Sequence, residues 1–308
     1  MDQEPALTRV VTLDGPVDHV RTLALLRHGP HDPAHRVVEG TVWHARQTTD
    51  GPVTVAVRAR DRATVEVNAW GPGAAATLDR IHLDLGAEDH PERFRPDHPV
   101  LADAVRRFPG LRMPRTAHVV EALLPAIIEQ RVTGADAFSA WRRLVLRHGE
   151  PAPGPTPGPM HVPPTARQWA ALASWEWHQG GVDPRRYRTA QAAVRLGPSL
   201  DRLARAGQAD PVRRALRSVP GVGAWTVAEV AARALGDADA VPWGDYHLGR
   251  IIGTGLAGRI VEGDEAVARL LEPWTGHRFR VWWLLGLSPS VRIERRGPRL
   301  SRQDYRRI

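Results

Sequence analysis

Hydrophobic and polar residues alternate along two segments of the first hundred residues. Hydrophobic side chains occupy positions 53, 55, 57 and 59 and then 65, 67 and 69, a period of two that is typical of strands with one buried face. The RDR between these segments predicts a tight hairpin turn, and TTDGP at 48–52 predicts a turn from an earlier strand around Val42. We therefore predict an antiparallel sheet, with helices near 18–28 and 73–81 covering one face.

From about residue 98 onward, hydrophobic residues recur with the spacing of helices, as in TAHVVEALLPAIIEQRV at 116–132. Three helix starts are predicted by capping signals, and one of these helices ends at Gly149. The signals are Thr133 with Asp136, Thr165 with Gln168, and Asp210 followed by Pro211. Seven prolines fall between 150 and 164, and because helices resume beyond them we interpret this stretch as an extended loop.

These patterns predict an α+β protein with a sheet domain followed by an all-helical domain. We assign 1–97 to a small mixed α/β domain with an antiparallel sheet, and 98–290 to the helical domain that contains the proline-rich loop. Residues 291–308 hold seven arginines and two acidic residues and form a basic tail. A chain of 308 residues, 42% of them hydrophobic, is long enough for two such domains.

Composition excludes several classes of site. Without cysteine there is no disulfide, iron–sulfur cluster, cysteine-ligated zinc or catalytic thiol. All 42 basic residues are arginine, so no lysine can form a Schiff base or serve a phosphate loop. Prolines interrupt the cluster of His28, His31 and His35, and we expect no metal and no cofactor. The start lacks a secretory signal and the longest apolar run is short, so we expect a cytoplasmic protein without a membrane partner.

Charge is distributed unevenly along the chain. Residues 1–100 contain 11 arginines against 15 acidic residues, whereas the remainder contains 31 arginines against 19. A basic helical domain favours a polyanionic partner such as nucleic acid. The alternative is an arginine-rich surface that is merely solvated, and charge alone does not decide between the two.

The stretch SVPGVGAWTVAEV at 218–230 interrupts a helical pattern with a glycine hairpin, PGVG at 220–223, and then resumes as a helix. A glycine hairpin that opens a helix exposes backbone N–H groups at the positive end of the helix dipole. These groups form a site suited to an anion such as a DNA phosphate. The alternative is an ordinary turn between two helices.

The residues around this hairpin resemble the helix-hairpin-helix DNA glycosylase superfamily, most closely its 3-methyladenine DNA glycosylase II branch. The resemblance lies in LRSVPGVGAWTVAEVAARAL at 216–235, followed by AVPWGDYHLGR at 240–250. It extends to RFPGLRMPRTAHVVEALLPAIIEQRVTG at 107–134 and to EPWTGHRFRVWWLLG at 272–286. It implies double-stranded DNA with damaged bases as partner, and we expect a monomer.

In that family an aspartate follows the hairpin by about twenty residues, and here Asp245 has this position. The resemblance implies a catalytic role: the carboxylate stabilises the positive charge that develops on the sugar and directs water. The alternative role of Asp245 is to cap the helix that follows. Contact with the DNA backbone is assigned to Gly221, Val222, Gly223 and Thr226.

Trp225 stands where bifunctional members of the superfamily carry their Schiff-base lysine. Its flat π face would attract a cationic alkylated base, and Tyr246 and Trp283 match other aromatic positions of the family's base pocket. The alternative for these aromatic residues is that they fill the core, as Trp282 beside Trp283 suggests.

Two further positions depart from the family pattern. Glu229, one helical turn after Trp225, either faces the base pocket or pairs with Arg233. Arg131, together with Gln130, lies where relatives insert a side chain into the gap left by the flipped base, and an arginine there could stack and also contact a phosphate.

These features predict a monofunctional DNA N-glycosylase of base excision repair. We expect it to flip out and hydrolytically release alkylated purines of the 3-methyladenine and 7-methylguanine type, without lyase activity. The alternatives are a glycosylase for deaminated or bulky bases and a DNA-binding protein of the same fold without catalysis.

Overall fold

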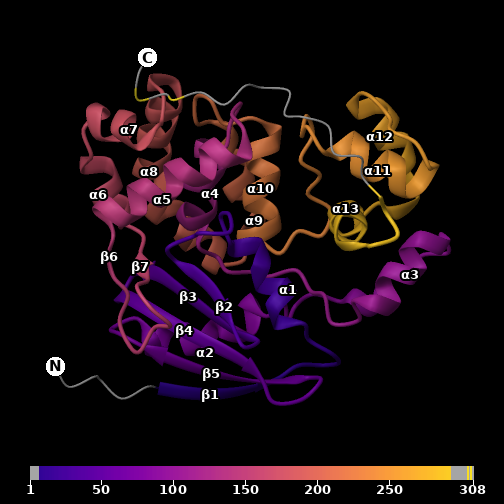
Figure 1. Cartoon of the computed structure of the whole chain (residues 1–308), viewed down its shortest axis with the longest axis horizontal. Helices are drawn as coiled ribbons and strands as arrows, with labels where there is room; N and C mark the ends of the chain where they lie inside the picture. Colours follow the sequence, from indigo (N-terminus) through magenta and orange to yellow (C-terminus); the bar gives the residue numbers. More distant parts are fainter. Residues whose placement is uncertain (1–6, 293–303, 305, 307–308) are drawn as a thin grey trace.

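A computed structural model describes residues 7–292, 304 and 306 of the chain (Figure 1). Its first part contains the predicted antiparallel sheet, with strand order β1-β5-β4-β3-β2. In the centre of the sheet, Val57 of β4 lies opposite Val42 of β3 and Val67 of β5. The five strands are β1 (Leu7–Thr12), β2 (His35–Val38), β3 (Thr41–Thr48), β4 (Gly51–Ala59) and β5 (Thr64–Trp70).

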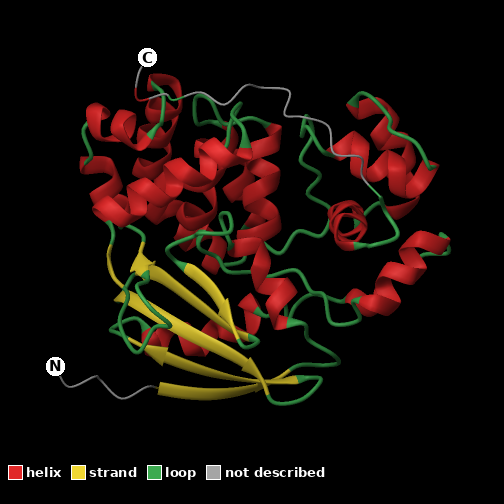
Figure 2. Cartoon of the chain, in the orientation of Figure 1, coloured by secondary structure: helices red, strands yellow, loops and turns green. Residues whose placement is uncertain are grey.

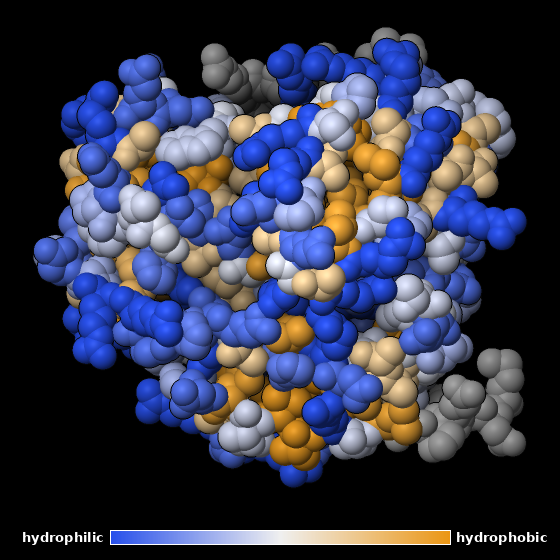
Figure 3. Space-filling view, turned by 180° about the vertical axis from the view of Figure 1, so that it is seen from behind, coloured by the Kyte–Doolittle hydropathy of each residue, from blue (hydrophilic) through white to orange (hydrophobic). Residues whose placement is uncertain are grey.

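Helices cover one face of this sheet, as the sequence predicts. They are α1 (His19–Leu23), the 3-10 turn η1 (Ala24–Leu26) and α2 (Ala74–Asp84), whose buried leucines and isoleucine pack on the inward-facing valines. The edge strands β1 and β2 carry exposed hydrophobic residues. The space-filling view from behind shows hydrophobic side chains gathered at the end of the molecule where the sheet lies (Figure 3).

The opposite face of β4 is buried as well, because Thr54 and Ala56 are inaccessible along with the valines that alternate with them. The proline-rich stretch contributes to this cover: it forms a short hairpin of β6 (Glu150–Pro151) and β7 (His161–Val162). Met160 and Val162 pack on Ala45, and the guanidinium of Arg36 donates to carbonyl oxygens within the stretch at 3.0 and 2.7 Å. The stretch is therefore a docked hairpin instead of the extended loop that we expected.

Helices build the rest of the described chain, as predicted, so the fold is α+β (Figure 2). These elements are η2 (Pro91–Arg93), α3 (Pro99–Arg107), α4 (Val119–Ile128), α5 (Gly134–His148), α6 (Ala166–Ala171), α7 (Ser174–Gly180), α8 (Pro184–Arg205), α9 (Ala209–Arg217), α10 (Ala224–Ala234), α11 (Leu248–Ala257), α12 (Asp264–Leu271), η3 (Glu272–Trp274) and α13 (Arg278–Leu287).

Helix α10 lies between two hydrophobic cores and contributes to both. Its Val227, Val230 and Ala234 belong to the core that contains α4, α5, α8 and α9. Its Ala228, Ala231 and Ala232 belong to the core built with α3, α11, α12 and α13, which lie together on the right of Figure 1. Helix α10, which the hairpin opens, is thus held between two packed groups of helices.

Two of the three predicted helix starts are confirmed. The Thr133 hydroxyl accepts from the Asp136 N–H, and Thr165 forms a reciprocal capping box with Gln168. The third is wrong, because α9 begins at Ala209 and places Asp210 inside the first turn, where it pairs with Arg213. A proline at position 211 is tolerated there because first-turn N–H groups have no partner within the helix.

The predicted division at residues 97 and 98 stays a prediction. The basic tail predicted at 291–308 lies largely outside the described residues. No helix among the described residues has both the length and the apolar character needed to cross a membrane.

Candidate active site

Asp245 and Trp225 are joined by a hydrogen bond. Trp225 is the second residue of α10, and Asp245 lies in the loop between α10 and α11. The indole Nε1–H of Trp225 donates to Oδ2 of Asp245 at 3.1 Å. Both side chains are half-buried, so the carboxylate is fixed in position and still reachable from outside.

The other carboxylate oxygen of Asp245 accepts from the backbone. Its Oδ1 receives the His247 N–H at 2.7 Å, immediately before α11 begins at Leu248. The N-cap residue of α11 is His247, so Asp245 steadies the turn before the helix without capping the helix itself. An ionised carboxylate can accept about four hydrogen bonds, so these two contacts leave capacity for water or substrate.

The two glycines of the hairpin have different reasons to be glycine. Gly221 has φ +88°, and a Cβ there would lie 2.2 Å from the Thr189 hydroxyl oxygen. Gly223 has an ordinary φ of −103°, and a Cβ there would meet nothing within 4 Å. Packing within the described residues therefore requires a glycine at 221 only. At 223 the missing side chain leaves the start of α10 open to an approaching group.

Gln130 braces this hairpin from the end of α4. Its Nε2 donates to the Gly221 carbonyl at 3.1 Å and to the Thr226 hydroxyl at 2.9 Å. Thr226 is buried and Val222 packs into the core, so neither side chain faces outward. Gln130 therefore braces the hairpin, and its wedge role stays a prediction.

Arg131 follows directly and is exposed, with a left-handed φ of +54°. For a residue with a Cβ this conformation costs about 1–2 kcal/mol. Backbone strain of this kind clusters at functional sites. The structure therefore brings Arg131 next to the braced hairpin, where the sequence predicts the wedge.

The aromatic candidates separate into exposed and buried residues. Tyr246 is 41% exposed beside Asp245, and its ring lies edge-on to His247 and 5.9 Å from the Arg250 guanidinium carbon. Trp283 is only 9% exposed and packs against Phe279 in the core. The structure therefore gives Trp283 the core role that the sequence left as its alternative. Elsewhere in that late segment, Trp274 and Trp282 are half-buried.

Glu229 pairs with Arg233, the second of the two predicted possibilities. Oε2 of Glu229 lies 2.8 Å from Nη1 of Arg233, and the Glu229 side chain is almost completely buried. Burial raises the pKa of Glu229, and the nearby carboxylates Glu129 and Asp245 raise it further, while Arg233 acts in the opposite direction.

Contacts from the sheet domain complete this region, and the sequence analysis missed them. Nε of Arg233 donates to the Leu25 carbonyl at 2.8 Å, and Nδ1 of His28 lies 3.4 Å from Oε1 of Glu129. The two residues of each contact are 208 and 101 positions apart in the sequence, so no local pattern predicts these contacts. The His28 ring thus lies beside a carboxylate. Among the described residues, no group of three or more potential metal ligands occurs.

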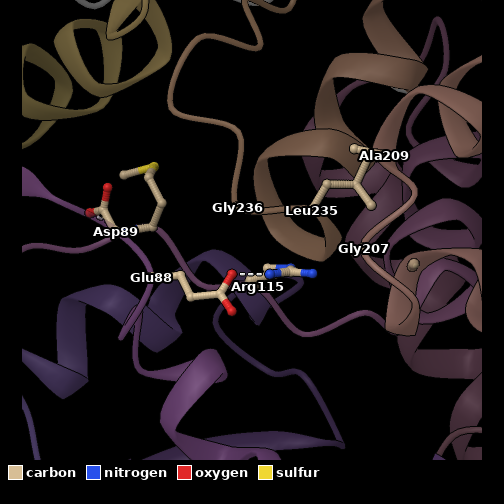
Figure 4. Close-up of a pocket in the computed structure, with 9 residues that line it drawn as sticks. Glu88, Asp89, Arg115, Gly207, Ala209, Leu235 and Gly236 are labelled. Carbon is tan, nitrogen blue, oxygen red and sulfur yellow. Dashed lines mark hydrogen bonds and ion pairs between the residues drawn. The ribbon is translucent and has the colours of Figure 1, made fainter.

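Two cavities lie at the junction of the sheet and the helices. One, of about 230 Å³, lies beside the C-terminal end of α10, which is the end away from Trp225. Figure 4 shows Glu88 and Arg115 paired at its edge, with Leu235 and Gly236 nearby. The other, of about 280 Å³, lies between β3, α4 and α8. Neither is lined by Asp245, Trp225 or Tyr246.

Buried charges line the second cavity and connect the sheet to α4. Arg46 of β3 bonds Asp84 at 2.6 Å, and His44 bonds Glu121 of α4 at 2.6 Å. Burial lowers the pKa of His118 to about 3, and burial raises the pKa of Asp201 to about 6. These groups belong to the domain junction and not to the candidate site.

Comparisons with known proteins agree with this fold. No family model matches the chain. It is 32% identical over 169 residues to a protein of Mycobacterium tuberculosis described as a probable bifunctional transcriptional activator and DNA repair enzyme AlkA. The match covers 54% of this chain and 33% of that protein, so the chain spans about a third of the length of the curated relative.

Solved structures share the arrangement over nearly the whole chain. A 3-methyladenine DNA glycosylase from Archaeoglobus fulgidus has a TM-score of 0.73 at 18% identity, covering 91% of this chain and 98% of that one. An 8-oxoguanine glycosylase/lyase from Clostridium acetobutylicum, bound to double-stranded DNA, has a TM-score of 0.65 at 12% identity, covering 92% and 97%. At these identities the likeness shows the fold.

Proposed function

We propose that this chain, which belongs to the helix-hairpin-helix DNA glycosylase superfamily and is similar to AlkA, hydrolyses the N-glycosyl bond of damaged bases in double-stranded DNA. Its substrates are alkylated purines of the 3-methyladenine and 7-methylguanine type. The observation that carries the proposal is the Asp245 carboxylate, which is held by Trp225 and by the His247 N–H beside the open hairpin.

Asp245 acts on the sugar of a nucleotide rotated out of the duplex. As the base leaves, positive charge develops on the sugar, and a carboxylate that is already oriented stabilises that charge without reorganising. The free lone pairs of Asp245 accept a hydrogen bond from water and direct it to the anomeric carbon. The two N–H donors keep the carboxylate in place throughout the reaction.

The hairpin and Arg131 hold the DNA. The first N–H groups of α10, uncovered by any side chain at Gly223, bind a backbone phosphate with the help of the helix dipole. Arg131 enters the stack where the base has left, and its planar guanidinium stacks on neighbouring bases. Phosphate contacts of this kind carry no sequence information, which suits a protein that must search all DNA for damage.

The reaction stops at the abasic site. Lyase activity in this superfamily proceeds through an imine between a lysine and the sugar, and the chain contains no lysine. Trp225 stands at that position and offers a π face and an N–H in place of an amine. A cationic alkylated base is a good leaving group, so the site does not need a strong general acid.

The similarity to an 8-oxoguanine glycosylase/lyase supports a second candidate, a glycosylase for another lesion on the same fold. A base-release assay separates the two candidates. Duplexes of one sequence, each with one 7-methylguanine, 3-methyladenine, hypoxanthine or 8-oxoguanine, are incubated with the protein and the free bases are identified. Release of the two alkylated purines supports the proposal, whereas release of only the other bases contradicts it.

A further inference from the structure

Four exposed arginines on α8 and α9 have no acidic partner. Arg185 and Arg188 lie in the first two turns of α8, and Arg214 and Arg217 lie in the last turn of α9. Within the part of the chain that the structure describes, none of the four guanidinium groups forms an ion pair or a hydrogen bond. We call Arg185, Arg188, Arg214 and Arg217 the arginine surface.

The acidic residues of these two helices are already paired with other arginines. Asp183, which caps α8, lies 2.6 Å from Nε of Arg186. Arg213 of α9 pairs with Asp210 at 2.9 Å and with Asp237 at 2.6 Å. Three of the four residues of the arginine surface have no acidic residue three or four positions away in the sequence. The positive charge of this surface is therefore not balanced from within its own helices.

The arginine surface adjoins the glycine hairpin. Arg217 is the last residue of α9, directly before the turn into the hairpin. Thr189 follows Arg188 in α8 and packs on the hairpin, since a Cβ at Gly221 would lie 2.2 Å from the Thr189 hydroxyl oxygen. Helices α8 and α9 also share one hydrophobic core. Both helices therefore bring their unpaired arginines to the hairpin that opens α10.

The first turn of α8 also reaches the end of α4. Arg186, which follows Arg185, donates from Nη1 to the Ile128 carbonyl at 2.5 Å. Arg131 lies three residues beyond Ile128 and is exposed. The arginine surface, the hairpin and Arg131 therefore lie on neighbouring parts of the molecule.

The arginines of each helix are spaced to contact neighbouring phosphates. Both pairs are three residues apart, so their Cβ atoms lie about 5–6 Å apart on one face of the helix. The phosphates of one DNA strand are separated by about 3.4 Å along the duplex axis. A planar guanidinium also matches the geometry of a phosphate group. Each pair can therefore bind successive phosphates of one strand.

We propose that the arginine surface binds backbone phosphates of the duplex on one side of the lesion, beyond the contacts of the hairpin and Arg131. This inference rests on the DNA partner of the proposed function and extends the bound length of DNA away from Asp245. Phosphates are the same in damaged and undamaged DNA. The surface therefore holds the protein on undamaged DNA during its search and adds no preference for a lesion.

The salt dependence of binding tests the arginine surface. Equilibrium binding to an undamaged duplex is measured over a range of salt concentrations for the wild type, Arg188→Gln, Arg217→Gln and the double variant. Each single substitution should make the slope of log K against log salt concentration shallower by about one, and the double variant by about two. The ratio of the affinities for a lesion duplex and an undamaged duplex should keep its wild-type value.

Arg62→Gln is the matched control, because it removes the same charge from an exposed position in the turn between β4 and β5. Its salt slope should equal that of the wild type, which separates a local contact from the effect of net charge. Glutamine is a good helix former, so Arg188→Gln and Arg217→Gln should keep the wild-type melting temperature.

A second measurement tests whether the surface lies on one side of the lesion. A duplex with a central lesion is compared with two duplexes in which one arm or the other is shortened to about half a helical turn. Shortening one particular arm should weaken wild-type binding and make the salt slope shallower, because the phosphates of that arm are lost. The double variant should lose little on shortening the same arm.

The outcomes distinguish failure of this inference from failure of the proposed function. A wild-type salt slope in the folded double variant overturns the inference and leaves the surface to solvent or to an acidic protein. An equal change of slope in Arg62→Gln overturns it as well. If the variants lose slope as expected but the wild type releases no base from the lesion panel, the proposed function alone is overturned. A folded wild type that binds no duplex overturns both.

Discussion

The indole nitrogen of Trp225 lies 3.1 Å from Oδ2 of Asp245 and donates a hydrogen bond to it. The sequence predicts a separate role for each residue, an aromatic face for Trp225 and a catalytic charge for Asp245. The bond combines them, since the N–H lies in the plane of the indole and leaves its π face unused. One side chain can therefore orient the carboxylate and stack on a base.

Trp225→Phe separates the two roles, because phenylalanine keeps an aromatic face and removes the N–H. A hydrogen bond to a charged group contributes about 1.5–3 kcal/mol, so the maximal rate of base release should fall about ten- to a hundredfold, with lesion binding largely retained. Trp225→Ala should additionally weaken binding of the 7-methylguanine duplex relative to undamaged DNA. Single-turnover rates and binding isotherms measure both effects, and a Trp225→Phe variant with the wild-type maximal rate would refute the orienting role.

The hairpin offers a matched pair of glycine variants. Gly223→Val adds a side chain where nothing in the fold obstructs it, so stability should hold while binding to all duplexes weakens alike. The slope of log K against log salt concentration should become shallower by about one, as loss of one phosphate contact implies. Gly221→Ala should instead lower the melting temperature, because its Cβ meets Thr189. An unchanged salt slope in folded Gly223→Val would argue against the phosphate site.

Buried groups at the domain junction predict how stability changes with pH. The pKa of His118 is lowered to about 3 by burial, so the folded state binds fewer protons than the unfolded one between about pH 3 and 6.5. Stability therefore falls as pH drops through this window, by up to about 1.4 kcal/mol per pH unit. Asp201, with its pKa raised to about 6, acts in the opposite direction between about pH 4 and 6.

Denaturant unfolding from pH 7 to 4 tests this balance. His118→Gln should flatten the loss of stability on acidification, and Asp201→Asn should steepen it. If both variants show the wild-type slope, these groups are not coupled to folding as their burial implies.

The absence of lysine predicts which DNA product remains after the base is released. Base release should leave an intact abasic site, and strand breakage should appear only after alkali or a separate lyase is added. Borohydride added during turnover should trap no protein–DNA adduct. A stoichiometric adduct would require the N-terminal amine to attack the sugar and would end the monofunctional interpretation.

Local patterns in the sequence predict much of the fold, and they point to several residues of the candidate site. Alternating valines identified β4 and β5, and the capping signals at Thr133 and Thr165 located two helices, because these features depend on neighbouring residues. The hairpin glycines and Asp245 were likewise recognised from a short motif. The structure joins them through the Trp225 bond, which no pattern of spacing reveals.

The remaining features depend on contacts between distant segments. The proline-rich hairpin docks through Arg36, the base of the site is completed by Leu25 and His28, and Trp283 is buried by helices from other parts of the chain. Asp210 shows that a local pattern can also mislead, since aspartate is favoured both at the N-cap and in the first turn of a helix. Apart from Asp210, these outcomes cannot be predicted from residues three or four positions away.

We propose that the Asp245 carboxylate drives release of the base, and Asp245→Asn is the variant that tests this role. The matched control is Asp264→Asn, whose carboxylate accepts from the Gly244 N–H in the same loop and should be dispensable. Single-turnover release of 7-methylguanine should fall by about two or more orders of magnitude in Asp245→Asn, with lesion binding and melting temperature close to wild type. Release by Asp245→Asn at the rate of Asp264→Asn would contradict the account.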